Sequence, residues 1–207
     1  MVNSHRLFTT FFLVLILAFA VISCEDNGAG GSSPVTNDGT GGGTANPDSY
    51  VTYNGTTYAL DKLYVLYSGA NTGDGESGYD VDLSIASPGV SADQNGDFSG
   101  DGAIAYVDIN TSGEFTIDSG TYSSGTARAP LVISYGDLSI GDGQNGYSPV
   151  GTDAGSASIT RDGEQYTIAF AYRVAADGSS IEGVYKGTIT NEYVPAGGEL
   201  SSSDLTW

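Results

Sequence analysis

Between residues 50 and 194, apolar and polar side chains alternate along the chain with a period of two, which is typical of half-buried β-strands. No part of this region repeats apolar residues at the spacing of an amphipathic helix over a helical length. In the clearest rows, every second residue from Tyr79 to Ile85, from Tyr166 to Val174 and from Ile181 to Ile189 is expected to face a core. The residues between them, including Asp80, Asp82 and Ser84, are expected to face water. The pattern predicts an all-β protein.

Dipeptides that contain glycine mark the turns between these strands. Asn54-Gly55 separates two short alternating runs, and this pair readily adopts the positive φ angles of a type I′ hairpin turn. Asp162-Gly163 and Asp177-Gly178 are predicted to join the last three strands into a meander. Weaker strands are expected near residues 103–109, 114–121, 128–135 and 156–161. We predict one antiparallel, meander-rich domain of about ten strands, either a curled barrel or a two-sheet sandwich.

Composition divides the 207-residue chain into four segments. Residues 1–23 carry Arg6 and then an apolar run that is typical of a secretory signal and shorter than the roughly 18 residues wanted for a membrane span. Residues 24–49 are rich in glycine and predict a flexible tether, with a root-mean-square reach of about 25–30 Å. Residues 50–194 form the predicted β-domain, and the tail 195–207 is expected to be loose.

The signal segment ends in Val21-Ile22-Ser23-Cys24. This tetrapeptide resembles the lipobox of bacterial lipoproteins, in which an aliphatic, a tolerant and a small position precede a cysteine. The resemblance implies cleavage before Cys24, a thioether-linked diacylglycerol on that cysteine, and acylation of the new amino terminus with a fatty acid such as palmitate. Two or three acyl chains hold a protein firmly at a bilayer, whereas one chain does so only marginally. An uncleaved signal anchor is the alternative.

Two further features resemble lipoproteins of the Bacteroidetes group. Glu25 and Asp26, directly after the cysteine, resemble the surface-export signal of that group, which implies display on the outer leaflet of the outer membrane. A periplasm-facing position is the alternative. Residues 155–190, GSASITRDGEQYTIAFAYRVAADGSSIEGVYKGTIT, resemble the closing hairpins of small all-β lipoproteins of the group, and residues 53–58 resemble their first hairpin. These motifs imply a fold and no particular chemistry.

Charge and reactive residues narrow the range of functions. With 25 acidic and 6 basic residues, the formal net charge is −19 at pH 7, which repels phosphate backbones, so we expect no nucleic-acid partner. The single histidine, His5, and the single cysteine, Cys24, both precede the predicted β-domain. The predicted domain therefore has no residues for a Ser-His-Asp triad, a Cys-His nucleophile or a histidine- or cysteine-ligated zinc site, and we do not expect an enzyme.

One acidic loop carries oxygen ligands at alternate positions: Asp93, Asn95, Asp97, Ser99 and Asp101. Calcium prefers carboxylate and amide oxygens of this kind, which makes calcium the one cofactor hypothesis. However, Phe98 stands where an EF-hand loop has glycine, and Ile104 stands where it has a bidentate glutamate. A solvated acidic loop without a metal is therefore the favoured interpretation.

Four tyrosines near strand ends or in loops are candidates for stacking on a sugar ring or anchoring a protein partner: Tyr122, Tyr135, Tyr147 and Tyr193. The sequence thus favours a lipid-anchored outer-membrane or cell-surface protein with a non-catalytic binding or structural β-domain. One alternative is an accessory glycan-binding lipoprotein. The other is a hydrolase that uses two carboxylates, which depends on a separation in space that no sequence pattern defines.

Overall fold

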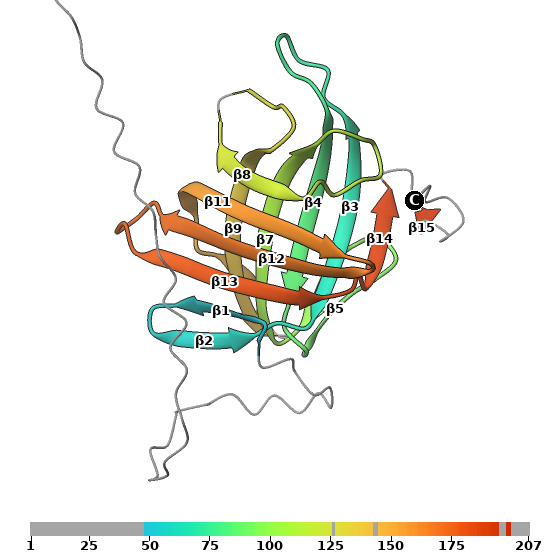
Figure 1. Cartoon of the computed structure of the whole chain (residues 1–207). Coiled ribbons are helices and arrows are strands. Elements are labelled where there is room, and N and C mark those ends of the chain that lie inside the picture. Colours follow the sequence, from blue (N-terminus) through green and yellow to red (C-terminus); the bar gives the residue numbers. More distant parts are fainter. Residues whose placement is uncertain (1–47, 126, 143–144, 195–197, 200–207) are drawn as a thin grey trace, which may run out of the picture. The chain divides into compact units, whose positions relative to one another are not determined.

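The computed structural model describes residues 48–125, 127–142, 145–194 and 198–199 (Figure 1). The signal segment, the lipobox residues and most of the predicted tether and tail lie outside the described residues, so the predictions for Val21, Ile22, Ser23 and Cys24 concern parts that the structure does not describe. The described residues form strands and loops without a helix, which confirms the all-β prediction. Accordingly, this part of the chain contains no helix that is long and apolar enough to cross a membrane.

Thirteen of the described strands form one curled, mostly antiparallel sheet with the shape of a half-barrel. Along the sheet the strands follow the order β15 (Gly198–Glu199), β14 (Asn191–Val194), β3 (Lys62–Ala70), β4 (Tyr79–Ala86), β7 (Gly102–Thr111), β9 (Val132–Asp142), β8 (Gly120–Ser124), β11 (Thr152–Asp162), β12 (Gln165–Val174), β13 (Ser180–Gly187), β1 (Tyr50–Tyr53) and β2 (Thr56–Ala59). Beside this path, β10 (Gly146–Pro149) pairs with β9. A separate hairpin consists of β5 (Val90–Ala92) and β6 (Phe98–Gly100).

The predicted turns are confirmed. Asn54 and Gly55, between β1 and β2, have φ angles of 48° and 75°, as a type I′ turn requires. Gly163 lies in the tight turn between β11 and β12, and Gly178 lies in the loop between β12 and β13, both with positive φ. These turns join β11, β12 and β13 into the predicted antiparallel meander, which Figure 1 shows in orange to red.

Two of the weaker strands differ from the prediction in their bounds. Residues 112–119 form a loop, and β8 begins only at Gly120, because the Asp118 carboxylate accepts hydrogen bonds from the backbone N–H and the hydroxyl of Ser112 and closes that loop. Residues 128–131 also lie outside a strand. Here Pro130 precedes Leu131, whose φ is 66°, and the N–H of residue 132 donates to the carbonyl of residue 129 at 3.0 Å, which is the geometry of a type II turn.

The core lies on the inner side of the curl. In Figure 1, β11, β12 and β13 cross in front of β3, β4, β7 and β9, and one cluster of buried apolar side chains contacts both groups of strands. The row predicted to face inward on β12 is confirmed, since each of its members is at most 4% exposed: Tyr166, Ile168, Phe170, Tyr172 and Val174. Removal of such side chains from water stabilises the fold by about 25 cal/mol for each Å² of apolar surface.

Glycines allow the large rings of the core to lie against neighbouring backbone. The Phe170 ring lies over Gly183, its direct partner on β13, where a Cβ atom would stand 2.2 Å from the ring. The Tyr172 ring lies over Gly136, where a Cβ atom would stand 2.3 Å from it. The strong curl and the aromatic core therefore depend on glycine at these positions.

We predict that Gly183→Ala lowers the free energy of unfolding by about 2 kcal/mol, because the added methyl group has to displace the Phe170 ring in a packed core. Urea unfolding followed by circular dichroism measures the change. In a Phe170→Leu background the same substitution should destabilise much less, since the ring that it meets has been removed. Equal destabilisation in the two backgrounds would contradict this explanation.

Candidate functional site

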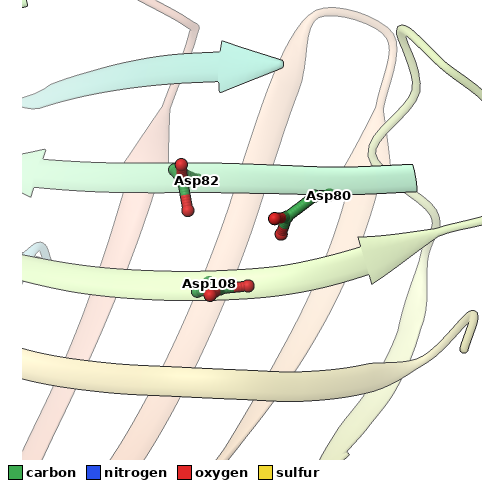
Figure 2. A group of neighbouring side chains, drawn as sticks. All are labelled: Asp80, Asp82 and Asp108. Carbon is green, nitrogen blue, oxygen red and sulfur yellow. The ribbon is translucent and has the colours of Figure 1, made fainter. Parts of the chain in front are cut away.

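Three carboxylates gather on the outer face of the sheet, which is the face opposite the core. Figure 2 shows Asp80 and Asp82 on β4 and Asp108 on β7, and we call these three residues the carboxylate cluster. The strand register places Asp82 directly opposite Asp108. One oxygen from each residue lies within 4.8 Å of the others. Over the described ranges, no other group of three or more histidine, cysteine, aspartate or glutamate side chains is gathered in this way.

The outer face of these strands is less open to water than the alternating pattern predicts. Asp80, Asp82 and Ser84 do point away from the main core, but Ser84 is buried and the two aspartates are half-buried. Part of this face is covered by the β5–β6 hairpin, where Phe98 packs edge-on against Tyr64 with ring centroids 5.5 Å apart, in a second small core. Alternation distinguishes the two faces of a strand, but it does not show what covers the outer face.

Two members of the cluster have hydrogen-bond partners. Asp82 accepts a hydrogen bond from the Tyr106 hydroxyl at Oδ1 and one from the Ser68 hydroxyl at Oδ2, the latter at 3.0 Å. Asp80 forms an ion pair through Oδ2 with Nη1 of Arg128, at 2.5 Å. The Pro-containing turn described above places Arg128 outside β9. Neighbouring side chains therefore hold both carboxylates of β4 in place.

Asp108 has no comparable hydrogen-bond donor within the described part of the chain. Its side chain is 8% exposed, and its buried Oδ1 lacks a donor, as does the buried Oδ1 of Asp80. Burial raises the pKa of Asp108 to about 8, followed by the charge of Asp80, a hydrogen bond to Asp80 that only the protonated Asp108 carboxyl can donate, and the charge of Asp82; Arg128 only partly opposes this. Burial also raises the pKa of Asp82, against the hydrogen bonds from Tyr106 and Ser68. A proton or a cation placed between these oxygens would relieve the repulsion.

Two aromatic rings border the carboxylate cluster. Tyr135 on β9 pairs with Asp108 across the sheet, and its ring centroid lies 5.9 Å from that of Tyr106. The Tyr135 hydroxyl donates to Asp137 at 2.9 Å. Because Tyr135 is 45% exposed, it presents an aromatic surface to solvent beside the carboxylates.

The four tyrosines predicted as binding residues lie in different environments. Tyr135 lies beside the cluster, and Tyr147 on β10 is half-buried and donates its hydroxyl to the Gly100 carbonyl. Tyr122 is fully buried in the main core, and Tyr193 is buried in the second core. Since a ring has to be exposed to stack on a ligand, the structure leaves Tyr135 and Tyr147 as candidates.

The predicted calcium loop forms the turn of the β5–β6 hairpin and the start of the path to β7. The Asp93 carboxylate accepts hydrogen bonds from the N–H groups of Asn95 and Asp97, at 2.8 and 3.0 Å. The bond from Asp97, followed by that from Asn95, lowers the pKa of Asp93. Ser99 lies on β6, and Asp101 follows that strand. Asp93 therefore closes a hairpin turn, and among the described residues the three aspartates of this loop are not gathered as Asp80, Asp82 and Asp108 are.

A shallow depression of about 290 Å³ lies on other strands, beside the β1–β2 turn. Its lining includes Asn54, Ser179 and Glu182. Glu182 is the only carboxylate in that lining, so this depression does not contain the pair of carboxylates that the hydrolase hypothesis requires.

Sequence reasoning missed the carboxylate cluster because its members come from different strands. Asp80 and Asp82 occupy alternate positions of β4, and Asp108 and Asn110 occupy alternate positions of β7. These two short motifs were visible in the sequence, but only the β4–β7 register brings them side by side.

Comparisons with protein-family models, with curated proteins and with solved structures found no match to this chain. The resemblance to bacterial lipoproteins therefore remains an expectation from short motifs. The function has to be argued from the residues themselves.

In the presence of a chelator, we predict that Asp108→Asn raises the free energy of unfolding at pH 7 by about 1 kcal/mol, because the neutral amide does not have to take up a proton when the chain folds, as the Asp108 carboxylate does. The folded protein holds the Asp108 proton up to a pKa of about 8, whereas the unfolded chain releases it near pH 4. Through this group, wild-type stability is therefore lost as the pH rises between those values. The advantage of the variant should shrink toward pH 4 in urea unfolding.

The matched control is Asp153→Asn, which neutralises an exposed carboxylate paired with Arg173. This control should show no gain in stability between pH 4 and pH 8, because its carboxylate is not held beside other acids. A difference between Asp108→Asn and wild type that stays constant over this pH range would contradict the role assigned to Asp108.

Proposed function

We propose that this protein is a lipid-anchored surface protein whose β-domain binds a ligand on the outer face of β3, β4, β7 and β9 and does not catalyse a reaction. The observation that carries the proposal is the carboxylate cluster, in which the buried Asp108 faces two like charges and receives no hydrogen bond from the described part of the chain. A buried charge of this kind lowers stability. Perturbed carboxyl groups of this kind concentrate at functional sites, which favours a binding role for this face.

The sequence before the domain supports attachment to the outer membrane. Cys24 of the lipobox is followed by the glycine-rich residues 25–49 and then by β1 at Tyr50. A coil of this length reaches about 25–30 Å, which would hold the domain clear of the lipid headgroups. Glu25 and Asp26 favour display on the outer leaflet over a periplasm-facing position.

The arrangement of the carboxylates supports binding over glycoside hydrolysis. Hydrolysis by a carboxylate pair requires two carboxyl groups that stand on the two sides of a scissile bond. In the cluster, one oxygen from each of the three residues lies within 4.8 Å of the others, and all three come from one face of adjacent strands. Such oxygens converge on one point and do not flank a substrate.

The second candidate function is glycan binding, with the glycan as the ligand of this outer face. Tyr135 is exposed on the same side of the sheet as the half-buried carboxylates. The apolar face of a sugar ring stacks on an aromatic ring, and sugar hydroxyl groups donate hydrogen bonds to carboxylates. The combination of Tyr135 with the cluster provides both kinds of contact.

We predict that Cys24→Ala moves the protein from the membrane fraction to the soluble fraction, because it removes the site of lipid attachment. Cell fractionation and mass spectrometry of the purified protein measure the change. Ser33→Ala, a conservative substitution within the tether, should leave the protein in the membrane fraction. A Cys24→Ala protein that stays with the membrane, while the wild type carries no added lipid mass, would contradict the proposed anchor.

For the glycan candidate, we predict that the full-length protein binds members of a glycan array and that Tyr135→Ala weakens this binding about tenfold, through loss of a stacking contact. Tyr50→Ala is the matched control, because Tyr50 is 40% exposed but lies on β1. This control should bind as the wild type does. The absence of wild-type binding at millimolar glycan would eliminate the glycan candidate, and equal losses in both variants would place the ligand elsewhere.

A further inference from the structure

We infer that Asp80, Asp82 and Asp108 bind one divalent cation of the calcium type on the outer face of the sheet. The inference rests on the proposed binding function of this face and names its ligand. It depends on two separate observations, which are the convergence of three carboxylates and the burial of Asp108 without a hydrogen-bond donor.

The distances within the cluster match the coordination sphere of calcium. Calcium binds oxygen at 2.3–2.6 Å, so two oxygen ligands of the same ion are at most about 5 Å apart. One oxygen from each of the three carboxylates lies within 4.8 Å of the others. In Figure 2, the side chains of Asp80 and Asp82 point toward β7 and Asp108. A single ion between β4 and β7 can therefore contact all three residues.

Two carboxylate oxygens of the cluster are left without a hydrogen-bond donor or a positive charge beside them. When Asp108 is ionised, Oδ1 of Asp108 and Oδ1 of Asp80 are both buried and accept no hydrogen bond from the residues that the structure describes. Each oxygen of Asp82 accepts one hydrogen bond and keeps a second lone pair for a metal. A cation at this point would satisfy the two unpartnered oxygens.

Neighbouring residues hold the proposed ligands in position. Tyr106 and Ser68 hydrogen-bond to Asp82, and Arg128 is bound to the other oxygen of Asp80. Such outer partners fix the orientation of metal-binding carboxylates. With all three carboxylates ionised and Arg128 positive, the local charge is −3 + 1 = −2, which a divalent ion neutralises and a monovalent ion does not.

The chemistry of the ligands favours calcium over other divalent ions. Zinc prefers histidine and cysteine, and the only histidine and cysteine of the chain are His5 and Cys24. Magnesium demands nearly ideal octahedral geometry at about 2.0–2.1 Å, whereas calcium accepts irregular arrangements of six to eight oxygens. Carboxylates fixed by strand register suit the more tolerant ion, with water completing its coordination.

The test uses the full-length protein in detergent after treatment with a chelator. Calorimetric titration with calcium chloride should show one site with a Kd on the order of 10⁻⁴–10⁻³ M, as in extracellular calcium modules. Calcium at about 10 mM should raise the melting temperature by about 4 °C or more, because the folded state alone binds the ion. Asp108→Asn should lose both effects, and Asp82→Asn serves as a second variant with the same expected loss.

Asp93→Asn is the matched control, because it makes the same substitution in the other acidic loop and keeps an oxygen that can close the hairpin turn. This control should bind calcium as the wild type does. Calcium stabilisation that disappears in Asp93→Asn and persists in Asp108→Asn would overturn the inference, as would a wild-type melting temperature that calcium leaves unchanged. Such a failure would leave Cys24-dependent membrane attachment and Tyr135-dependent binding intact, so it is distinguishable from failure of the proposed function.

Discussion

The fold depends on the burial of one face of a single sheet against itself. Because the described strands include no covering helix, the apolar rows of β3, β4 and β7 can leave water only by contact with the rows of β11, β12 and β13. The sheet has to curl strongly for this contact, and glycines such as Gly136 and Gly183 permit it by allowing aromatic rings to lie against backbone. The inner face is therefore committed to stability, and the proposed binding site lies on the outer face.

The outer face of β4 and β7 carries carboxylates, which do not stabilise the fold as the buried apolar rows of the inner face do. Asp108 is buried beside two other carboxylates, and its raised pKa reflects the unfavourable environment of its charge. The hydroxyl groups of Ser68 and Tyr106 hold Asp82 in place, and Arg128 holds Asp80. None of these groups donates a hydrogen bond to Asp108. A rigid apolar core keeps the side chains of the outer face in fixed positions, as the proposed binding site requires.

Much of the fold could be predicted from local patterns. The alternation of Tyr166 to Val174 identified the inward face of β12, and Asn54-Gly55 identified the first hairpin, because both signals act over neighbouring residues. The carboxylate cluster could not be predicted in this way, since Asp82 and Asp108 meet only through the register of two strands. The acidic loop at Asp93 had a clearer sequence signal for a metal site. However, the Asp93 carboxylate accepts hydrogen bonds from the N–H groups of Asn95 and Asp97 in the same turn.

By itself, the sequence determined the all-β class, the turns, the inward rows and the absence of histidine and cysteine from the domain, because these follow from residue type and short-range periodicity. Only the tertiary structure decided that the sheet is an open half-barrel, that Tyr122 is buried while Tyr135 is exposed, and that three aspartates converge. These properties depend on which strands pair and what covers each face, and pairing between distant segments leaves no local pattern along the chain.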